Sequence, residues 1–410
     1  MTEERTRADL HIHSHYSRAT SPQMNIEALA GYAKVKGIDV LGTGDFTHPL
    51  WLKEMKEKLA EDSGLYSYDD LKFMLTAEIS LIYSQESELD EKKGRRIHIV
   101  MLAPNFDIVD QINEMLLKIG RTDYDGRPIF GRSCIEMTEN LMQISKDIEV
   151  IPAHVWTPWF GLFGSKGGFN TVKDCFQDKT KYIHALETGL SSDPAMNWRL
   201  SNLDKYTLVS FSDSHSPWPW RLGRECCVMD MKNINYNEIL KVIRTKKGFD
   251  YTIEVDPGYG KYHEDGHRKC NIHFTPEESK KHGGICPVCK RDLTIGVLNR
   301  VEELADRPEG YELKGAIPFK TLLPLHEIIS AVKQKAVATK TVGEIAEQFM
   351  KIGTELDILE NIDEKKLSEI DEKIAKIIIQ IRNGNIKIDA GYDGVYGKLI
   401  LDKKKTLKDF

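Results

Sequence analysis

The sequence predicts an α/β protein: a parallel sheet or barrel, then a small metal-binding module and a mainly helical C-terminal domain. Three observations support this. Short apolar runs alternate with helical patterns over about the first 250 residues, cysteines and histidines cluster next, and amphipathic helical patterns follow. Repeated strand and helix units build parallel sheets and barrels. We therefore expect a catalytic domain over 1–252, a metal module over 253–298 and a helical, DNA-contacting domain over 299–410.

The composition is that of a soluble globular protein, with 40% hydrophobic and 29% charged residues in 410. At roughly 150 residues per domain, this length allows two or three domains. No apolar run approaches the roughly 18 residues of a spanning helix, so we expect a cytoplasmic protein without a membrane partner. The net charge of -6 argues against coating nucleic acid through bulk positive charge. A locally basic groove remains possible, because bound ions neutralise the carboxylates of a metal site.

Six apolar runs predict buried strands, and each ends where polar residues begin. The runs are IDVLGTGD, LKFMLTAEISLIY, RIHIVMLAP, IEVIPAHV, YIHALETGL and YTLVSFSD. Helical patterns such as MNIEALAGYAKVKG separate several of them, with a glycine after the last periodic position. Such folds place their sites at the C-terminal ends of parallel strands. The candidate ligands at those ends are Asp45, Glu78, His154, Glu187, Asp213 and His215.

The strongest local signal is His11 and His13, which alternate on a predicted strand and therefore share a face. Two imidazoles on one face suit a divalent metal, although the pair alone is equally compatible with surface or core histidines. Further candidates follow strand-like runs in a fixed order. They are Asp45 with His48, Glu78, His98, His154, and Asp213 with His215.

This ordered set resembles the polymerase-and-histidinol-phosphatase (PHP) family over roughly the first 225 residues. The resemblance implies a distorted (β/α)7 barrel with two or three metals at its C-terminal rim. When the family's ligand positions are transferred to this sequence, the resemblance implies a first ion held by His11, His13, Glu78 and Asp213. Glu78 would also bridge to a second ion held by His98 and His154. Asp45 or His48, together with His215, would hold a third. The family usually has Thr-Asp-His at the second motif, whereas His48 comes three residues after Asp45, so either or both could bind.

The predicted chemistry follows from these ions. Metals about 3.5 to 4 Å apart lower the pKa of a bridging water and hold phosphate oxygens. Mixed histidine and carboxylate ligands suit zinc, manganese or iron better than magnesium alone. We expect Zn²⁺ in the small module and at the catalytic centre, with Mg²⁺ or Mn²⁺ as alternatives at the centre.

A second resemblance narrows the substrate. Residues 187–199, 212–217 and 222–225 resemble endonuclease Q, a DNA repair family that cleaves 5′ to uracil, hypoxanthine and xanthine and at abasic sites. It implies catalytic roles for Glu187, Asp193 and Asp213 and damaged single- or double-stranded DNA as partner, with a sliding clamp as a further possible partner. Asp193 could instead cap a helix before Pro194. The competing functions are a small-molecule PHP phosphatase and a non-catalytic nucleic-acid-binding module.

Aromatic and basic residues near the predicted rim are candidates for contacting DNA. An enzyme that flips a base needs an apolar wedge or stacking wall, and basic groups meet phosphates. The alternative for the aromatics is a packed hydrophobic loop. The substrate candidates are Trp156, Trp159, Phe160, Lys166, Ser192, Asn197, Arg199, Arg221 and Arg224.

Cys270-x2-His273 and Cys286-x2-Cys289 have the spacing of a structural tetrahedral zinc finger. His267 and His282 are reserve ligands nearby. The other four cysteines are expected to be buried small hydrophobes. Beyond them, PLHEIISAVKQK, TVGEIAEQFMKIG and KKLSEIDEKIAKIIIQIRNG predict three amphipathic helices, and IKIDAGYDGVYGKLIL predicts a hairpin with its turn at 392–394.

Overall fold

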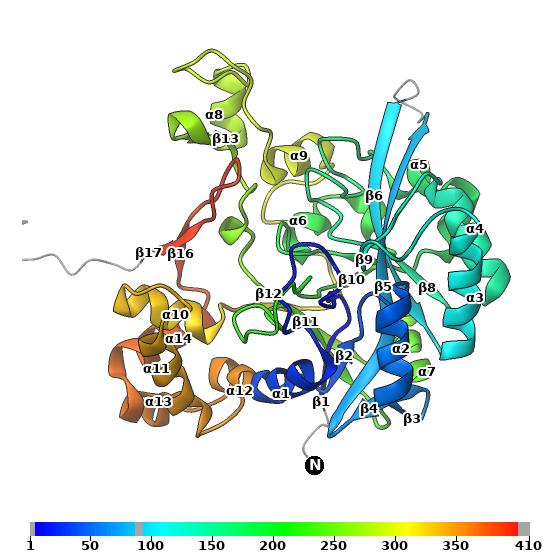
Figure 1. Cartoon of the computed structure of the whole chain (residues 1–410). Helices are drawn as coiled ribbons and strands as arrows, with labels where there is room; N and C mark the ends of the chain where they lie inside the picture. Colours follow the sequence, from blue (N-terminus) through cyan, green and yellow to red (C-terminus); the bar gives the residue numbers. More distant parts are fainter. Residues whose placement is uncertain (1–4, 87–92, 401–410) are drawn as a thin grey trace, which may run out of the picture.

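A large mixed sheet forms the centre of the computed structural model, which describes residues 5–86 and 93–400 (Figure 1). Its strands run in the order β15-β12-β11-β1-β2-β5-β4-β3, with β6 and β7 paired to β5, and β8 to β6. Their bounds are β1 Arg5–Asp9, β2 Val40–Gly42, β3 Ala60–Asp62, β4 Leu65–Tyr68, β5 Leu71–Gln85, β6 Lys93–Ala103, β7 Ile129–Phe130, β8 Glu149–Pro152, β11 Cys226–Asp230, β12 Phe249–Glu254 and β15 Phe319–Thr321.

The sheet is mixed, where the sequence predicted parallel strands. β1, β2 and β5 are parallel neighbours, whereas β6 pairs antiparallel to β5 and β11 antiparallel to β1. Only residues 86–92 separate β5 from β6. A parallel crossover needs a dozen or more residues, so this connection can only form a hairpin.

A small parallel pair, β9 (Ala185–Glu187) with β10 (Thr207–Val209), forms a separate two-stranded sheet next to β8. The Val155 N–H donates to the Glu187 carbonyl, and Ile12 forms a parallel bridge with Ser214. The ends of β8, β9 and β10 therefore meet the end of β1. The α/β class is confirmed, while its interpretation as a closed PHP barrel stays a prediction.

Helices cover the outside of this sheet (Figure 1). α1 illustrates how local sequence signals define the two ends of a helix. It begins after the cap Asn25, whose side chain accepts from the Ala28 N–H, and it ends at Gly37 in the left-handed region at φ 90°. The helices of this part are α1 Ile26–Lys36, α2 Pro49–Lys58, α3 Phe106–Leu117, α4 Cys134–Ile144, α5 Val172–Phe176, α6 Pro194–Trp198 and α7 Tyr236–Thr245.

The cysteine-containing segment projects from the sheet as a small unit (Figure 1). It consists of the hairpin β13 (Asp265–His267) and β14 (Ile272–Phe274), followed by α8 (Pro276–Lys281). α9 (Val297–Leu304) then returns the chain to the sheet, where the Arg300 guanidinium donates to the Phe163 carbonyl.

The C-terminal region is mainly helical, as predicted, with α10 Leu325–Lys333, α11 Lys340–Met350, α12 Glu355–Glu360, α13 Glu364–Ile370 and α14 Glu372–Arg382. The single helix predicted over 365–384 is wrong. Asp371 interrupts it, because its backbone is extended and its carboxylate caps α14 through the Lys373 and Ile374 N–H groups. No helix in the described part of the chain is long and apolar enough to cross a membrane.

The terminal hairpin is confirmed as β16 (Lys387–Asp389) with β17 (Lys398–Ile400). Its turn closes where predicted, because the Val395 N–H donates to the Tyr392 carbonyl. The hairpin also contacts the cysteine-containing unit, since the Glu264 N–H donates to the Gly391 carbonyl. It therefore ties that unit to the C-terminal helices.

Candidate metal centre

Side chains from within β5 and β6 and from the segments that follow β1, β8 and β10 meet in two clusters that share Glu78. One contains His11, His13, Glu78 and Asp213, and the other contains Glu78, His98 and His154. Within each cluster the candidate ligand atoms lie within 4.8 Å of one another. These are the two ligand sets that the PHP resemblance implied.

The two carboxylate oxygens of Glu78 face different histidine pairs. Oε2 lies 3.6 Å from Nε2 of His11 and 3.3 Å from Nε2 of His13. Oε1 lies 2.7 Å from Nδ1 of His98 and 3.1 Å from Nε2 of His154. A carboxylate in this position can bridge two cations.

Several ligand atoms in the first cluster make no hydrogen bond although they are buried. They are Nε2 of His11, Nε2 of His13 and Oδ1 of Asp213. An unsatisfied buried polar group costs about 1 to 3 kcal/mol. A divalent cation would satisfy all three atoms at once, so the residues present fit a metal.

Carboxylates behind the paired histidines fix their orientation. Nδ1 of His11 lies 2.9 Å from Oε1 of Glu187, and Nδ1 of His13 lies 3.0 Å from Oδ1 of Asp45. This arrangement leaves each Nε2 pointing at the cluster, as in the carboxylate–histidine pairs that support metal ligands. Glu187 also accepts a hydrogen bond from the His154 N–H at 2.9 Å.

The backbone at three of these positions adopts the left-handed region, with φ of 52° at Asp45, 30° at His154 and 46° at Asp213. Such conformations cost about 1 kcal/mol or more and persist only where the surroundings impose them. Gly189 is one such constraint, because a Cβ there would lie 2.5 Å from the Cβ of His154. The chain is held tightly around the centre.

The ligands expected for a third ion are not brought together. Oδ2 of Asp45 already accepts from the Ser14 N–H, the Ser14 hydroxyl and the Ser17 hydroxyl at 2.6 to 2.9 Å. His48 stacks on Tyr16 with ring centroids 4.3 Å apart, and Nδ1 of His215 donates to the Asp213 carbonyl. None of the three joins a group of candidate ligands among the described residues. In this structure Asp45 orients His13, and its role as a metal ligand stays a prediction.

The electrostatics of the clusters favour cations. Burial opposes protonation of His11, but Glu187 and Glu78 raise its pKa well above the usual range. Burial likewise opposes ionisation of Glu78, but the neighbouring histidines and Arg127 hold its pKa well below normal. Protons on His11 and His13 would have to leave when an ion binds, so metal affinity should weaken as the pH falls.

Arg127 was missed by the sequence analysis, although its Nη1 lies 3.0 Å from Oε2 of Glu78. It follows Asp125 and Gly126 in the loop between α3 and β7. No strand ends there and no metal-ligand spacing surrounds it. Only the folded position of the loop reveals the contact.

Asp193 belongs to neither cluster of candidate ligands, and its catalytic role stays a prediction. It caps α6, with Oδ1 accepting from the Met196 N–H at 2.8 Å. Three substrate candidates, Ser192, Asn197 and Arg199, are buried and bonded within the protein in this structure. Their partners are the Thr188 carbonyl, the Trp156 indole and Glu302, respectively.

The aromatic candidates differ from one another in how far they are buried. Trp156 is 0% exposed, and its indole donates to Asn197, so it cannot wedge between bases. Trp159 is half-buried against Tyr262, with ring centroids 5.1 Å apart. Phe160 lies 4.3 Å from the His98 ring, beside the second cluster. Lys166 is exposed.

A cavity of about 460 Å³ lies near the centre, although no residue of either cluster lines it, and Arg221 and Arg224 from the candidate set line it. Arg224 donates to the Ser212 carbonyl directly before Asp213, and Leu190 follows the Gly189 that packs on His154. Trp220 also lines it and was missed. Its signal was present in Ser-Pro-Trp-Pro-Trp, which directly follows His215.

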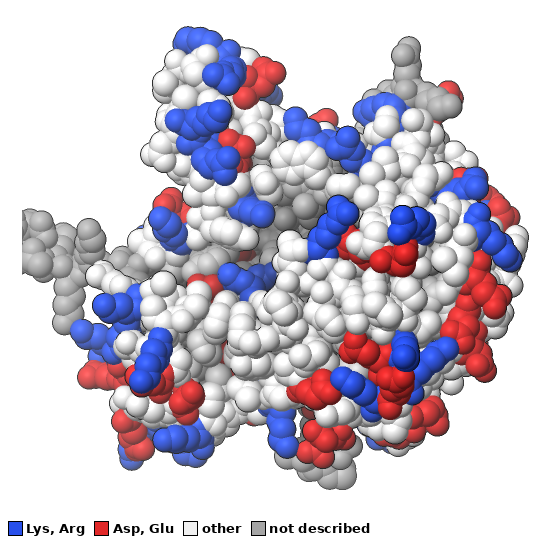
Figure 2. All heavy atoms as spheres, in the orientation of Figure 1, with Lys and Arg blue, Asp and Glu red and all other residues white. Residues whose placement is uncertain are grey.

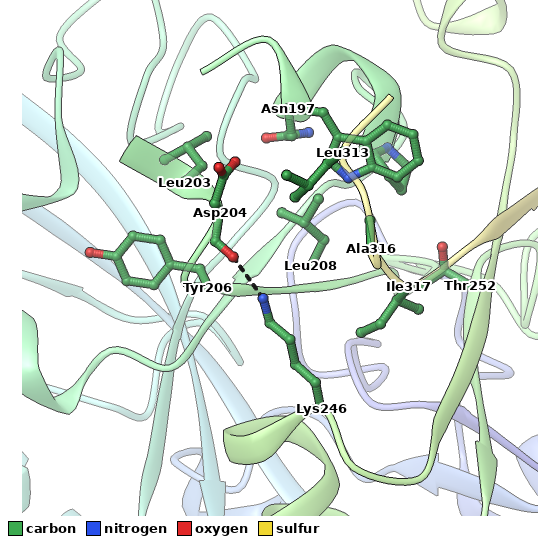
Figure 3. Close-up of a pocket in the computed structure, with 12 residues that line it drawn as sticks. Asn197, Leu203, Asp204, Tyr206, Leu208, Lys246, Thr252, Leu313, Ala316 and Ile317 are labelled. Atoms are coloured by element: carbon green, nitrogen blue, oxygen red, sulfur yellow. Dashed lines mark hydrogen bonds between the residues drawn. The ribbon is translucent and has the colours of Figure 1, made fainter. Parts of the chain in front are cut away.

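A second cavity, beside Asn197, is too small to be a substrate site (Figure 3). Its volume is about 30 Å³, which is room for about one water. The Lys246 ammonium donates to the Asp204 carbonyl at 2.8 Å at its edge.

The finger ligands need one correction. Cys270, Cys286 and Cys289 gather with His267, whereas His273 stacks on Tyr392 and bonds Glu264. In the β13–β14 hairpin, His273 pairs with Gly266 and Ile272 with His267. Paired residues share a face, so His273 lies on the face opposite His267. His282, the other reserve ligand, stacks on Phe274.

Three thiols and one imidazole are a donor set that suits a structural zinc. The pKa of Cys286 is lowered to about 6, mainly because the Cys289 N–H points at its sulfur. That shift favours the thiolate, which is the metal-binding form. The remaining cysteines, Cys134, Cys175, Cys226 and Cys227, are buried.

Residues 324–385 match the family described as the MJ0043 C-terminal domain. A *Methanocaldococcus jannaschii* protein, uncharacterized protein MJ0043, is 34% identical over 297 residues, which are 71% of this chain but only 36% of that protein. The chain therefore spans about a third of that relative. A *Bacillus subtilis* protein, uncharacterized protein YqxK, is 27% identical over 96% of this chain and 98% of its own length.

Two solved structures are similar over nearly the whole chain. The lesion-specific endonuclease PfuEndoQ from *Pyrococcus furiosus* has a TM-score of 0.87 and 30% identity, covering 99% of this chain and 98% of that one. An endonuclease Q complex with a 27-mer duplex carrying an abasic lesion at the active site has a TM-score of 0.87 and 31% identity, covering 99% of both chains. The chain belongs to the endonuclease Q family.

Proposed function

We propose that this protein is a metal-dependent DNA repair endonuclease that hydrolyses the phosphodiester 5′ to uracil, hypoxanthine or xanthine and at abasic sites. Glu78 carries the proposal, because its two oxygens face two histidine pairs in a chain that matches endonuclease Q from end to end. We also assign the curved sheet to a PHP barrel, and zinc to the finger.

Bound ions would lower the pKa of a water and neutralise the phosphate. The protein's side chains fix the orientation of the metal-binding histidines. Glu187 and Asp45 hold Nε2 of His11 and His13 on the cluster, and Ser80 holds His98 through a 2.8 Å hydrogen bond. In the proposed reaction, the water oxygen bonds to phosphorus and the bond to the upstream 3′ oxygen breaks. That oxygen takes a proton, which yields a 3′-hydroxyl and a 5′-phosphate.

The cavity beside the centre is the proposed pocket for the flipped lesion. Its volume of about 460 Å³ lies within the roughly 300 to 1,000 Å³ of small-molecule sites. Trp220 provides an aromatic wall, and Arg221 and Arg224 provide donors. α10 and β17 close the other side, so the pocket joins the catalytic part to the C-terminal domain.

The surface around the centre suits a nucleic acid despite the acidic net charge. Lys and Arg gather on the projecting finger and around a hollow between finger, hairpin and catalytic part (Figure 2). Basic groups position phosphates without reading sequence. We propose that damaged DNA crosses this hollow.

The proposal is tested with end-labelled duplexes that carry one uracil, hypoxanthine, xanthine, abasic site or normal base. We expect a single cut 5′ to each lesion and none at the normal base. Unpaired or mispaired lesions should be cut faster, because unstacking costs less there. Hydrolysis of small phosphomonoesters without cleavage of any duplex would instead identify a PHP phosphatase.

The pocket is tested separately by filling it. Ala331 lines the cavity, so Ala331→Trp should slow cleavage at uracil more than at an abasic site, which has no base to accommodate. Ala336→Trp, on the exposed surface nearby, is the control. Equal slowing at both lesions would place the base elsewhere.

A further inference from the structure

The Arg127 side chain extends from the loop between α3 and β7 to Glu78 in the metal centre. Nη1 lies 3.0 Å from Oε2 of Glu78, the oxygen that faces His11 and His13. The side chain is 26% exposed, whereas Glu78 is 0% exposed. The Arg127 side chain therefore contacts a buried ligand and is also partly exposed to solvent.

The loop that carries Arg127 is anchored against the centre on three sides. The Gly126 N–H donates to the Tyr16 carbonyl, and the Gly126 carbonyl accepts from the Thr47 hydroxyl. Asp125 accepts from the backbone N–H groups of Arg18 and Arg127. Arg127 is thus fixed at its base, and its position is built into the fold.

The same loop covers the carboxylate expected to hold a third ion. A Cβ on Gly126 would lie 2.3 Å from Oδ2 of Asp45 and 2.3 Å from the Ser17 hydroxyl. The backbone at Gly126 therefore packs directly against Oδ2 of Asp45 and closes that side of the carboxylate to an ion. His48 stacks on Tyr16 with its buried Nδ1 left without a hydrogen-bond partner, whereas Nδ1 of His215 donates to the Asp213 carbonyl. Neither histidine joins Asp45 in a group of candidate ligands among the described residues.

We propose that Arg127 takes the place of a third cation: the centre binds two ions, and the Arg127 guanidinium donates to a non-bridging oxygen of the scissile phosphate. The inference rests on the proposed hydrolysis of a phosphodiester. A guanidinium is always charged and carries five N–H donors, so its contact with Glu78 leaves others for the phosphate. It places positive charge where charge develops in the transition state.

The ion count tests this directly and requires no substrate. Native mass spectrometry and elemental analysis of the full chain, saturated with Mn²⁺ or Zn²⁺, should give two ions besides the finger zinc. Arg127→Ala should bind the same number. A third ion at the wild-type centre, or loss of ions from Arg127→Ala, would overturn the proposal.

Turnover supplies the second measurement, on bis(p-nitrophenyl) phosphate and on a uracil duplex. Removing a preorganised donor to the developing charge costs about 10² to 10³ in kcat, so Arg127→Ala should fall by that factor with little change in KM. Millimolar guanidinium should restore part of the loss, and Arg127→Lys should retain part of it. Rescue by guanidinium would show that the variant lacks only the positive charge, because added guanidinium cannot restore a displaced loop.

Arg121→Ala is the matched control, because Arg121 lies in the same loop with a 75% exposed side chain paired to Asp123. It should keep wild-type turnover. Unchanged kcat in Arg127→Ala, or no response to guanidinium, would refute the role. If wild type cuts no lesion duplex, the proposed repair function fails, while the ion count and the small diester still decide the role of Arg127.

Discussion

The ligand sets of the metal centre were predicted more accurately than that of the finger, although the finger ligands lie closer together in the sequence. The centre draws its ligands from strand ends as distant as His11 and Asp213, yet the structure brings together both ligand sets expected from the sequence. The finger draws all its ligands from residues 267–289, yet one was assigned wrongly. Sequence distance was therefore not what made prediction difficult.

The difference lies in what fixes each side chain's direction. His11 and His13 follow the end of β1, on either side of the Ile12 bridge to Ser214, and the alternation of an extended chain places both on one face. In the finger, His267 and His273 compete within one hairpin, and its register decides between them. His273 is drawn to Tyr392, which comes from the terminal hairpin far along the chain. Spacing alone contains no information on that contact.

Glu78→Gln should have the largest effect. The amide cannot bridge two cations as a carboxylate does, so both ions should be lost from the centre and lesion cleavage abolished, with the finger zinc retained. Elemental analysis and the uracil duplex assay measure the two effects. Glu139→Gln on the surface of α4 is the control, and near wild-type cleavage by Glu78→Gln would refute the ligand assignment.

The finger gives the next largest effect and tests the corrected ligand. His267→Ala should release the finger zinc and make residues 260–295 sensitive to limited proteolysis, because the module has little core without its metal. His273→Ala should keep the zinc. The opposite pattern would restore the ligand set expected from spacing.

The carboxylates behind the histidines should have a smaller effect. Asp45→Asn and Glu187→Gln remove charge that orients His13 and His11, and such changes cost about 10- to 100-fold in metal affinity or activity. Titration of apoprotein with Mn²⁺ measures the affinity, with Asp70→Asn as an exposed control. A loss as complete as that of Glu78→Gln would make either residue a ligand.

The smallest predicted effect concerns stability away from the centre. Burial raises the pKa of Glu254 to about 8, so the folded state holds a proton that the unfolded chain releases near the ordinary pKa of 4.5. This stabilising contribution is present below about pH 4.5 and lost as the pH rises toward 8. Glu254→Gln should therefore flatten the fall of unfolding free energy over that range.

Chemical denaturation at several pH values measures that slope. Glu344→Gln, on an exposed face of α11, should leave it unchanged. A Glu254→Gln curve parallel to that of wild type would mean that Glu254 is ionised in the fold throughout this range.

The sequence predicted β2, β5, β6, β8, β9 and β10 from its six apolar runs, and α1, α10 and α11 from their periodicity, because these are local signals. It did not predict β3, β4, β11 or β12. It failed where tertiary contacts decide. Trp156 was expected at the rim and is buried on Asn197, whereas Arg127 was overlooked because nothing near it in sequence marks the loop that carries it. The break at Asp371 depends on a capping carboxylate within an otherwise continuous amphipathic pattern.

The most direct test of the account uses metal-depleted protein and a duplex with one uracil, labelled at either end of the damaged strand. The account predicts no cleavage until Mn²⁺, Zn²⁺ or Mg²⁺ is restored. A single cut 5′ to the uracil should then leave a 3′-hydroxyl and a 5′-phosphate that ligase can rejoin on an undamaged template. Cleavage without metal, or cuts that ignore the uracil, would contradict it.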